Sequence, residues 1–259
     1  MSSILASEWL KLRSVRSTYV ILGLSLCTVL LGLGLAAMAA DMYDAAPVEQ
    51  QLRARIAALE EVLVIVPQLC LGVLGTLAIT SEYVTGLIRT TLAVVPRRWP
   101  ILAAKSVIIG TLGLLVGAAA VFGTYFATKS MLGDRFSGAY ATAFGDRLPL
   151  LIALTLTVPV FALLGLALGA LLRSTAGAMA IIVSLVYVIP MIIGQLPEPW
   201  SEFFGSLMIG ALPQEVIGGS NANSVYGSLL PPPAAAVALV LYAVAPLVIA
   251  AWLIRRRDA

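Results

Sequence analysis

Histidine is absent from the 259 residues, and charged residues make up only 11% of the chain. Without histidine the chain lacks the commonest metal ligand and the commonest general base, so no Ser–His or Cys–His catalytic pair can form. A soluble domain carries roughly 25% charged residues, because its surface faces water. The scarcity of charge therefore excludes an ordinary soluble fold and indicates that the chain lies mostly in lipid.

Cysteine is also scarce, and both cysteines, Cys27 and Cys70, lie inside apolar runs. A structural disulfide belongs to an oxidising aqueous compartment, so we interpret both thiols as small buried apolar groups. The net charge of +3 does not indicate a nucleic-acid partner, because the basic residues stand at the ends of apolar segments. Basic residues in such places set membrane topology.

The chain does contain long uncharged runs. A helix needs about 20 apolar residues to cross the hydrocarbon core of a bilayer. The expected spans are 18–40, 62–81, 106–128, 148–172, 175–196 and 234–254. The last is separated from the preceding run by Pro231-Pro232-Pro233. The sequence therefore predicts an all-α integral membrane protein with six transmembrane helices, folded as a single transmembrane domain over residues 1–259.

The charges flanking these spans predict the orientation. The face with both termini carries eleven basic and three acidic residues, and the opposite face carries five basic and ten acidic residues. Because basic residues favour the inner side, we expect both termini in the cytoplasm. The basic residues of that face are Lys11, Arg13, Arg16, Arg89, Arg97, Arg98, Lys105, Arg173 and Arg255 to Arg257.

Two features predict how the helices pack and bend. Gly113-x-x-x-Gly117 and Gly165-x-x-x-Gly169 place small residues on one face of the third and fourth spans, where backbones can approach closely. Three prolines, Pro67, Pro159 and Pro190, interrupt helix interiors and are expected to kink them.

The outer segment between the fifth and sixth spans has its own pattern. Trp200, Phe203, Phe204, Leu207 and Met208 recur at helical spacing, and the pattern stops before Pro213. We expect an amphipathic or re-entrant segment at the outer interface, although one or two aromatic belt residues would give a similar pattern.

The middle of every expected span lacks Asp, Glu, Lys and Arg. Ion-coupled transporters usually need such a residue, or broken helices, at mid-depth. The chain also lacks the Gly-x-x-x-x-Gly-Lys-Ser/Thr loop that binds nucleotide phosphates. If the chain moves solutes uphill, we expect the energy to enter through another subunit, and the uncharged spans favour an apolar or amphipathic cargo.

The segment 81–105 is the most informative one. Ser81-Glu82 is a favourable helix start, an apolar stripe follows at helical spacing, and Pro96 ends it before Arg97 and Arg98. The pattern predicts an amphipathic helix that lies along the cytoplasmic face. The residues alone leave two interpretations open: a lever gripped by a partner, or an interfacial helix whose arginines only anchor topology.

Several segments resemble the permeases of ABC-2-type transporters, especially the short bacterial ones. They are 6–20, the segment from Glu82 to Lys105 with Gly86-Leu87-Ile88-Arg89 and Pro96-Arg97-Arg98, 171–175 (Leu-Leu-Arg-Ser-Thr) and Leu212-Pro213. The resemblance implies the membrane subunit of an ATP-driven exporter in the bacterial cell membrane. It implies two paired permease copies and a separate ATP-binding subunit that holds ATP and Mg, with no cofactor, metal or catalytic residue in this chain.

The resemblance also implies roles for individual residues. Glu82, Gly86, Arg89 and Arg173 would couple to the ATP-binding subunit. Trp9, Arg97, Arg98 and Lys105 would be interfacial anchors, with Trp9 on an amphipathic helix that precedes the first span. The alternatives are a secondary transporter or channel not driven by ATP and, less favoured by the missing histidine, an intramembrane enzyme or assembly scaffold.

Overall fold

The computed structural model describes residues 2–84, 99–133, 135–219, 227 and 229–256. Within them, six helical segments are long and apolar enough to cross a membrane: Arg16–Ala45, Leu59–Val84, Trp99–Leu132, Phe144–Leu172, Thr175–Ile193 and Pro232–Leu253. The prediction of an all-α integral membrane protein is confirmed. The first and third segments are longer than expected, so Lys105 lies in the second turn of a helix and not before it.

The spanning segments are built from helices α2 (Arg16–Ala45), α4 (Leu59–Leu63) with α5 (Ile65–Val84), α7 (Trp99–Leu132), α8 (Phe144–Leu172), α9 (Thr175–Val183) with η1 (Ser184–Val188) and α10 (Ile189–Ile193), and α13 (Pro232–Arg256). The shorter elements are α1 (Ser2–Ser14), α3 (Val48–Gln51), α11 (Trp200–Ser206), α12 (Leu212–Val216) and the two-residue strands β1 (Arg55–Ile56) and β2 (Ser137–Gly138), which pair in parallel.

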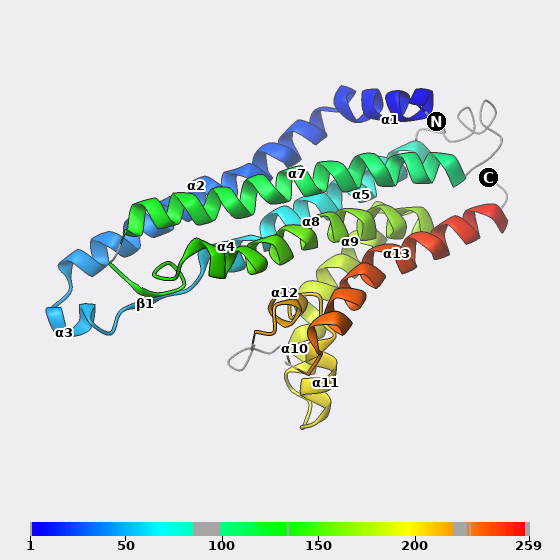
Figure 1. Ribbon diagram of the computed structural model, residues 1–259. Helices are drawn as coiled ribbons and strands as arrows, with labels where there is room; N and C mark the ends of the chain where they lie inside the picture. The colour runs from blue at the N-terminus through cyan, green and yellow to red at the C-terminus, as the bar shows by residue number, and fades with distance from the viewer. Residues whose placement is uncertain (1, 85–98, 134, 220–226, 228, 257–259) are drawn as a thin grey trace.

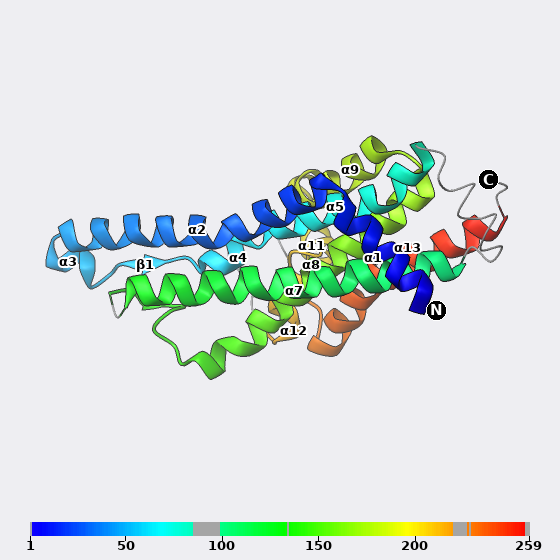
Figure 2. The same ribbon diagram turned by 90° about the horizontal axis from the view of Figure 1, so that it is seen from above.

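Helix α8 is the centre of the bundle. In its spanning window 78% of the residues are buried, against 28% in α2 and 22% in α13. It packs against α5, α7 and α13, while α2 lies outside α5 and α7. In both views α1 and the C-terminal end of α13 lie at the same end of the molecule, and α3 lies at the opposite end (Figures 1 and 2). We call these the termini end and the far end.

Close packing of α5, α7 and α8 explains the glycines of the two Gly-x-x-x-Gly faces. A Cβ on Gly165 would overlap the carbonyl oxygen of Gly72 on α5, and a Cβ on Gly113 would lie 2.9 Å from the Cα atom of Pro159 on α8. Small residues thus let backbones touch where lipid provides no hydrophobic drive for association. Both faces are covered by helices of this chain.

Two of the three prolines expected to kink helices, Pro67 and Pro190, lie just after a break in a helix. The break between α4 and α5 falls at Val64, ahead of Pro67, and the π-helical turn η1 directly precedes Pro190 in α10. Proline has no N–H and its ring clashes with the carbonyl four residues earlier, so it favours a break or a wider turn in the helix. Pro159, by contrast, is accommodated within α8, which continues through it from Phe144 to Leu172.

The segment between α10 and α13 forms two short helices. On α11 the aromatic rings of Trp200, Phe203 and Phe204 are exposed and lie against one another, as an interfacial helix requires. The helix ends at Ser206, earlier than the pattern suggested, and Met208 turns inward with an exposed fraction of 9%. Pro213 belongs to the first turn of α12, where a missing N–H is tolerated.

Candidate functional site

The candidate site is the termini end of the bundle, where α5 ends at Val84 and α7 begins at Trp99. These ends flank the segment that the sequence singles out. Residues 85–98 lie outside the described residues, and with them Gly86, Arg89, Arg97 and Arg98. The predicted helix and the roles of these four residues stay predictions, and the site is built from the side chains around them.

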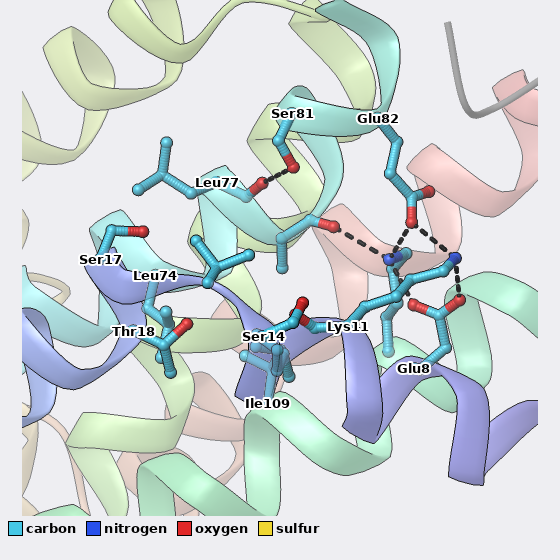
Figure 3. A pocket seen from close by; sticks show the side chains of 14 residues that line it. Glu8, Lys11, Ser14, Ser17, Thr18, Leu74, Leu77, Ser81, Glu82 and Ile109 are labelled. Atoms are coloured by element: carbon cyan, nitrogen blue, oxygen red, sulfur yellow. Dashed lines mark hydrogen bonds and ion pairs between the residues drawn. The ribbon is translucent and has the colours of Figure 1, made fainter. Parts of the chain in front are cut away.

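Four charged side chains from three helices meet there, and we call them the ion cluster: Glu8 and Lys11 of α1, Glu82 of α5 and Lys105 of α7. One carboxylate oxygen of Glu82 accepts hydrogen bonds from both ammonium groups, at 2.9 Å from Lys11 Nζ and 2.9 Å from Lys105 Nζ. Glu8 accepts from Lys11 at 2.7 Å through one oxygen and from Lys105 through the other. The labelled acids and Lys11 converge in Figure 3.

The ion cluster is almost dry. Glu8 is 3% exposed, Glu82 5% and Lys105 5%, whereas the Lys11 side chain is 38% exposed. Charges out of water are tolerated only when paired and hydrogen-bonded, and this set of two acids and two bases is neutral. Lys105 donates in addition to the carbonyl oxygen of Ala78 at 2.9 Å, so its three N–H groups all have acceptors.

The environment of Lys11 keeps its ammonium charged. Desolvation lowers its pKa, but the hydrogen bonds and the negative charges of Glu8 and Glu82 outweigh this effect, so the pKa lies above its ordinary value. Glu8 and Lys11 are neighbours on α1 because they are three residues apart. Trp9 of the same helix is 46% exposed, and its role as an interfacial anchor stays a prediction.

The last turns of α5 also contact the turn between α8 and α9. The guanidinium carbon of Arg173 lies 5.0 Å from the centre of the Tyr83 ring, within cation–π range. The Thr175 hydroxyl donates to the Thr80 hydroxyl at 2.8 Å. Arg173 has a φ of 52°, in the left-handed region, so the chain reverses tightly here between two spans.

The predicted site residues that the structure describes thus differ in their exposure to solvent. Arg173 is exposed on its turn, but Glu82 and Lys105 are buried against one another. The three N–H groups of Lys105 already bind protein acceptors, so its position does not match the expected contact with lipid headgroups. Sequence reasoning missed Glu8 as a partner of Lys105. The available signal was an acid and a base at i, i+3 spacing on the amphipathic helix expected before the first span.

A second polar network lies outside the termini end. The side chain of Glu60 on α4 accepts from the Tyr140 hydroxyl at 2.6 Å and from Arg147 of α8 at 3.0 Å. Arg147 also donates to Glu61 at 3.1 Å, and Glu61 accepts from Gln214 of α12 at 2.7 Å. Burial and the hydrogen bond with Glu60 raise the pKa of the Tyr140 hydroxyl above its ordinary value. These contacts join α4, α8 and α12.

Neither network forms a metal site. The described part of the chain contains no group of three or more Cys, Asp and Glu side chains arranged to hold a metal ion. Among the described residues, the side chains that form hydrogen bonds between helices at the termini end are charged groups and hydroxyls.

Comparison with known proteins agrees with the resemblance noted in the sequence. The family described as "ABC-2 family transporter protein" matches residues 4–259. No curated protein matches the chain. The family match spans all six candidate membrane segments, α1 and the flanks of the segment 85–98. The chain therefore belongs to the ABC-2 family of transporter proteins.

Proposed function

We propose that this multi-pass membrane protein is the permease subunit of an ATP-driven exporter. A separate ATP-binding subunit docks on the segment 85–98 and on the turn at Arg173. Family membership supports the permease assignment. Under this proposal the termini end faces the cytoplasm of a bacterial cell and two permease copies pair. The Gly-x-x-x-Gly faces are already covered within the chain, so pairing uses other helices.

One observation carries the proposal: the last turns of α5 bind α1, α7 and the α8–α9 turn at the termini end. Glu82 binds α1 through Lys11 and α7 through Lys105. Tyr83 contacts Arg173 in the α8–α9 turn, and Thr80 binds Thr175 at the start of α9. The chain passes from these turns directly into the segment 85–98. We call Ala78–Val84 the junction turns.

These contacts define how force from a docked partner would spread. The ion pair of Glu82 and Lys105 joins the two helices that flank the segment, so pulling on the segment displaces α5 and α7 together. Glu8 adds α1 to this unit, since it holds the other side of Lys105. About two turns before Glu82, α5 meets α8 backbone to backbone at Gly75 and Gly165, so displacement of α5 would also displace the central helix.

The position of each residue determines its proposed role. Glu82 and Lys105 are positioning residues, since each holds the other in place across the two flanking helices. We therefore assign Lys105 no contact with lipid headgroups. Arg173 is the second contact with the ATP-binding subunit, since its turn is exposed and tied to Tyr83. Gly86 and Arg89 retain their proposed contact with that subunit, and Arg97 and Arg98 their proposed anchoring to lipid.

The first experiment is assembly. An affinity-tagged chain, expressed with its proposed ATP-binding subunit, is expected to co-purify with that subunit as a complex containing two permeases. A reporter active only in the cytoplasm is expected to be active when fused after Ala259 and silent when inserted at Asn221. A chain that purifies without an ATP-binding subunit and still moves solute would instead be a secondary transporter or channel.

A further inference from the structure

A cavity of about 230 Å³ lies beside the ion cluster, between the elbow of α1 and α2 and the walls of α5 and α7. The elbow contributes Ser14, Val15, Ser17 and Thr18, and α5 contributes Leu74 and Leu77 among others. Figure 3 shows these side chains around the cavity, with Lys11 and Glu82 at one end of it. The coupling mechanism makes no use of this space.

The lining has two chemically different parts. Leu74 and Leu77 of α5 and Ile109 of α7 form an apolar wall. Lys11, Ser14 and Ser17 supply an ammonium and two hydroxyl groups from the elbow. A ligand that satisfies both parts must be an amphiphile, with a hydrocarbon portion against the leucines and a hydrogen-bonding portion at the elbow.

The charge balance at the cavity favours an anionic amphiphile. The two carboxylates in the lining, Glu8 and Glu82, each already bind both ammonium groups. Two of the three N–H groups of Lys11 serve these acids, and its side chain stays 38% exposed. Beside it in the chain, Arg13 and Arg16 are exposed and form no ion pair with another described residue. The surplus charge at the elbow is therefore positive.

The place and size of the cavity identify the source of such an amphiphile. The elbow is where the first spanning helix begins, so a headgroup phosphate at Lys11 would lie where headgroups lie in the surrounding bilayer. The volume is below the roughly 300 Å³ of the smallest pockets that enclose a whole drug-sized ligand. It suits a molecule that inserts only part of one chain and leaves the rest in the bilayer.

We propose that this cavity binds one anionic phospholipid. Its phosphate accepts from Lys11 and from the Ser17 hydroxyl, since the Ser14 hydroxyl already donates to the carbonyl oxygen of Lys11. A stretch of one acyl chain lies along Leu74, Leu77 and Ile109. Arg13 and Arg16 add the preference for negative headgroups. The bound lipid fills the space between the elbow and α5, so it braces α1 against the junction turns.

Native mass spectrometry of the purified chain tests the proposal. The probes are dioleoyl phosphatidylglycerol and dioleoyl phosphatidylcholine, which share acyl chains and differ in charge. We expect the first adduct of the anionic lipid to form with about tenfold higher affinity. Lys11→Gln and the double variant Arg13→Gln/Arg16→Gln should each reduce this preference, and the double variant does so with the ion cluster intact.

The apolar wall is tested separately. Leu77→Trp fills the cavity from a half-buried position and should lower binding of the first lipid at least tenfold. Leu114→Trp, on a 42% exposed site of α7 outside the cavity, should leave binding unchanged, and unfolding midpoints show that both variants fold.

Three results would overturn the proposal: equal affinity for the two lipids, undiminished binding in Leu77→Trp, or displacement of the anionic lipid by millimolar inorganic phosphate. None of these measurements requires the ATP-binding subunit, so they can fail independently of the proposed function.

Discussion

The ammonium group of Lys105 lies 2.9 Å from the carboxylate of Glu82, and the two residues stand on either side of the segment 85–98. This ion pair joins the end of α5 to the second turn of α7, with both side chains 7% exposed or less. The two helices that flank the segment are therefore joined by a buried charge pair. A partner that moves the segment must move both helices or break the pair.

Removing the ammonium group of Lys105 should destabilise the protein. Lys105→Met leaves two buried carboxylates with the single ammonium of Lys11, and we expect the free energy of unfolding to fall by about 3 kcal/mol. The control is Arg135→Met, which removes an exposed pair with Asp44 and should cost much less, because exposed ion pairs contribute little to stability. Thermal unfolding in detergent measures both. Equal losses in the two variants would contradict the picture of a dry ion cluster.

The close glycine contact between α5 and α8 predicts that Gly→Ala substitutions have opposite effects on stability at two positions. Gly165→Ala places a Cβ on the carbonyl of Gly72, so we expect a loss of about 3 kcal/mol, the upper end for overpacking. Gly34→Ala on α2 meets nothing within 4 Å and should stabilise the protein slightly, because alanine favours helix. Unfolding midpoints compare them. A tolerated Gly165→Ala would mean that α5 and α8 are less closely packed than described.

Much of this architecture follows from the sequence, because each apolar run longer than a bilayer crossing leaves few alternatives to a helix. The same reasoning placed Lys105 at a lipid surface, since a base at the end of an apolar run usually marks topology. Its true neighbours, Glu8 and Glu82, lie 97 and 23 positions away in the chain, and no local pattern specifies such pairings. The break at η1 could be expected from Pro190, but the burial of Glu8 on α1, whose other described side chains are exposed or half-buried, could not.

Two substitutions of Arg173 distinguish its effect on stability from its proposed role in binding the ATP-binding subunit. Its left-handed backbone favours glycine by about 1 kcal/mol, while its contact with Tyr83 contributes about 0.5–1 kcal/mol. We expect Arg173→Gly to leave the free energy of unfolding within about 0.5 kcal/mol of wild type, because the two effects cancel. Arg173→Ala loses the contact without the backbone gain and should be less stable. Both should weaken co-purification of the ATP-binding subunit. Full retention of that subunit by both would remove Arg173 from the proposed interface.

The buried carboxyl of Glu215 on α12 should make the stability of the protein depend on pH. Its side chain is 1% exposed, and its Oε2 atom has no hydrogen-bond partner among the described residues. Burial raises the pKa of this carboxyl above 4.5, against the opposing effect of the backbone N–H groups of Leu230 and Leu229. A raised pKa means that the folded state holds the proton longer, so Glu215 makes the protein less stable as pH rises from about 4.5 through the folded pKa.

Replacing this carboxyl tests the sign. Glu215→Gln keeps an acceptor for Leu230 and cannot ionise, so it should raise the unfolding midpoint at about pH 8 and have little effect at about pH 4. The control is Glu202→Gln on α11, a residue exposed at the surface. The reverse order, with the larger gain at low pH, would show that the folded protein prefers the ionised carboxylate.

The central claim is that the junction turns carry motion from the ATP-binding subunit into the bundle, and thiol labelling tests it most directly. Cys27 and Cys70 are first replaced by alanine, and a cysteine is placed at Leu185, which lines a separate cavity of about 130 Å³ shared with Gln68 and Phe161. In the complex, ATP with vanadate should change the maleimide labelling rate at this site. In Glu82→Ala the ATP-binding subunit should still co-purify and hydrolyse ATP, but labelling should no longer respond to ATP. An unchanged response to ATP in Glu82→Ala would contradict the account.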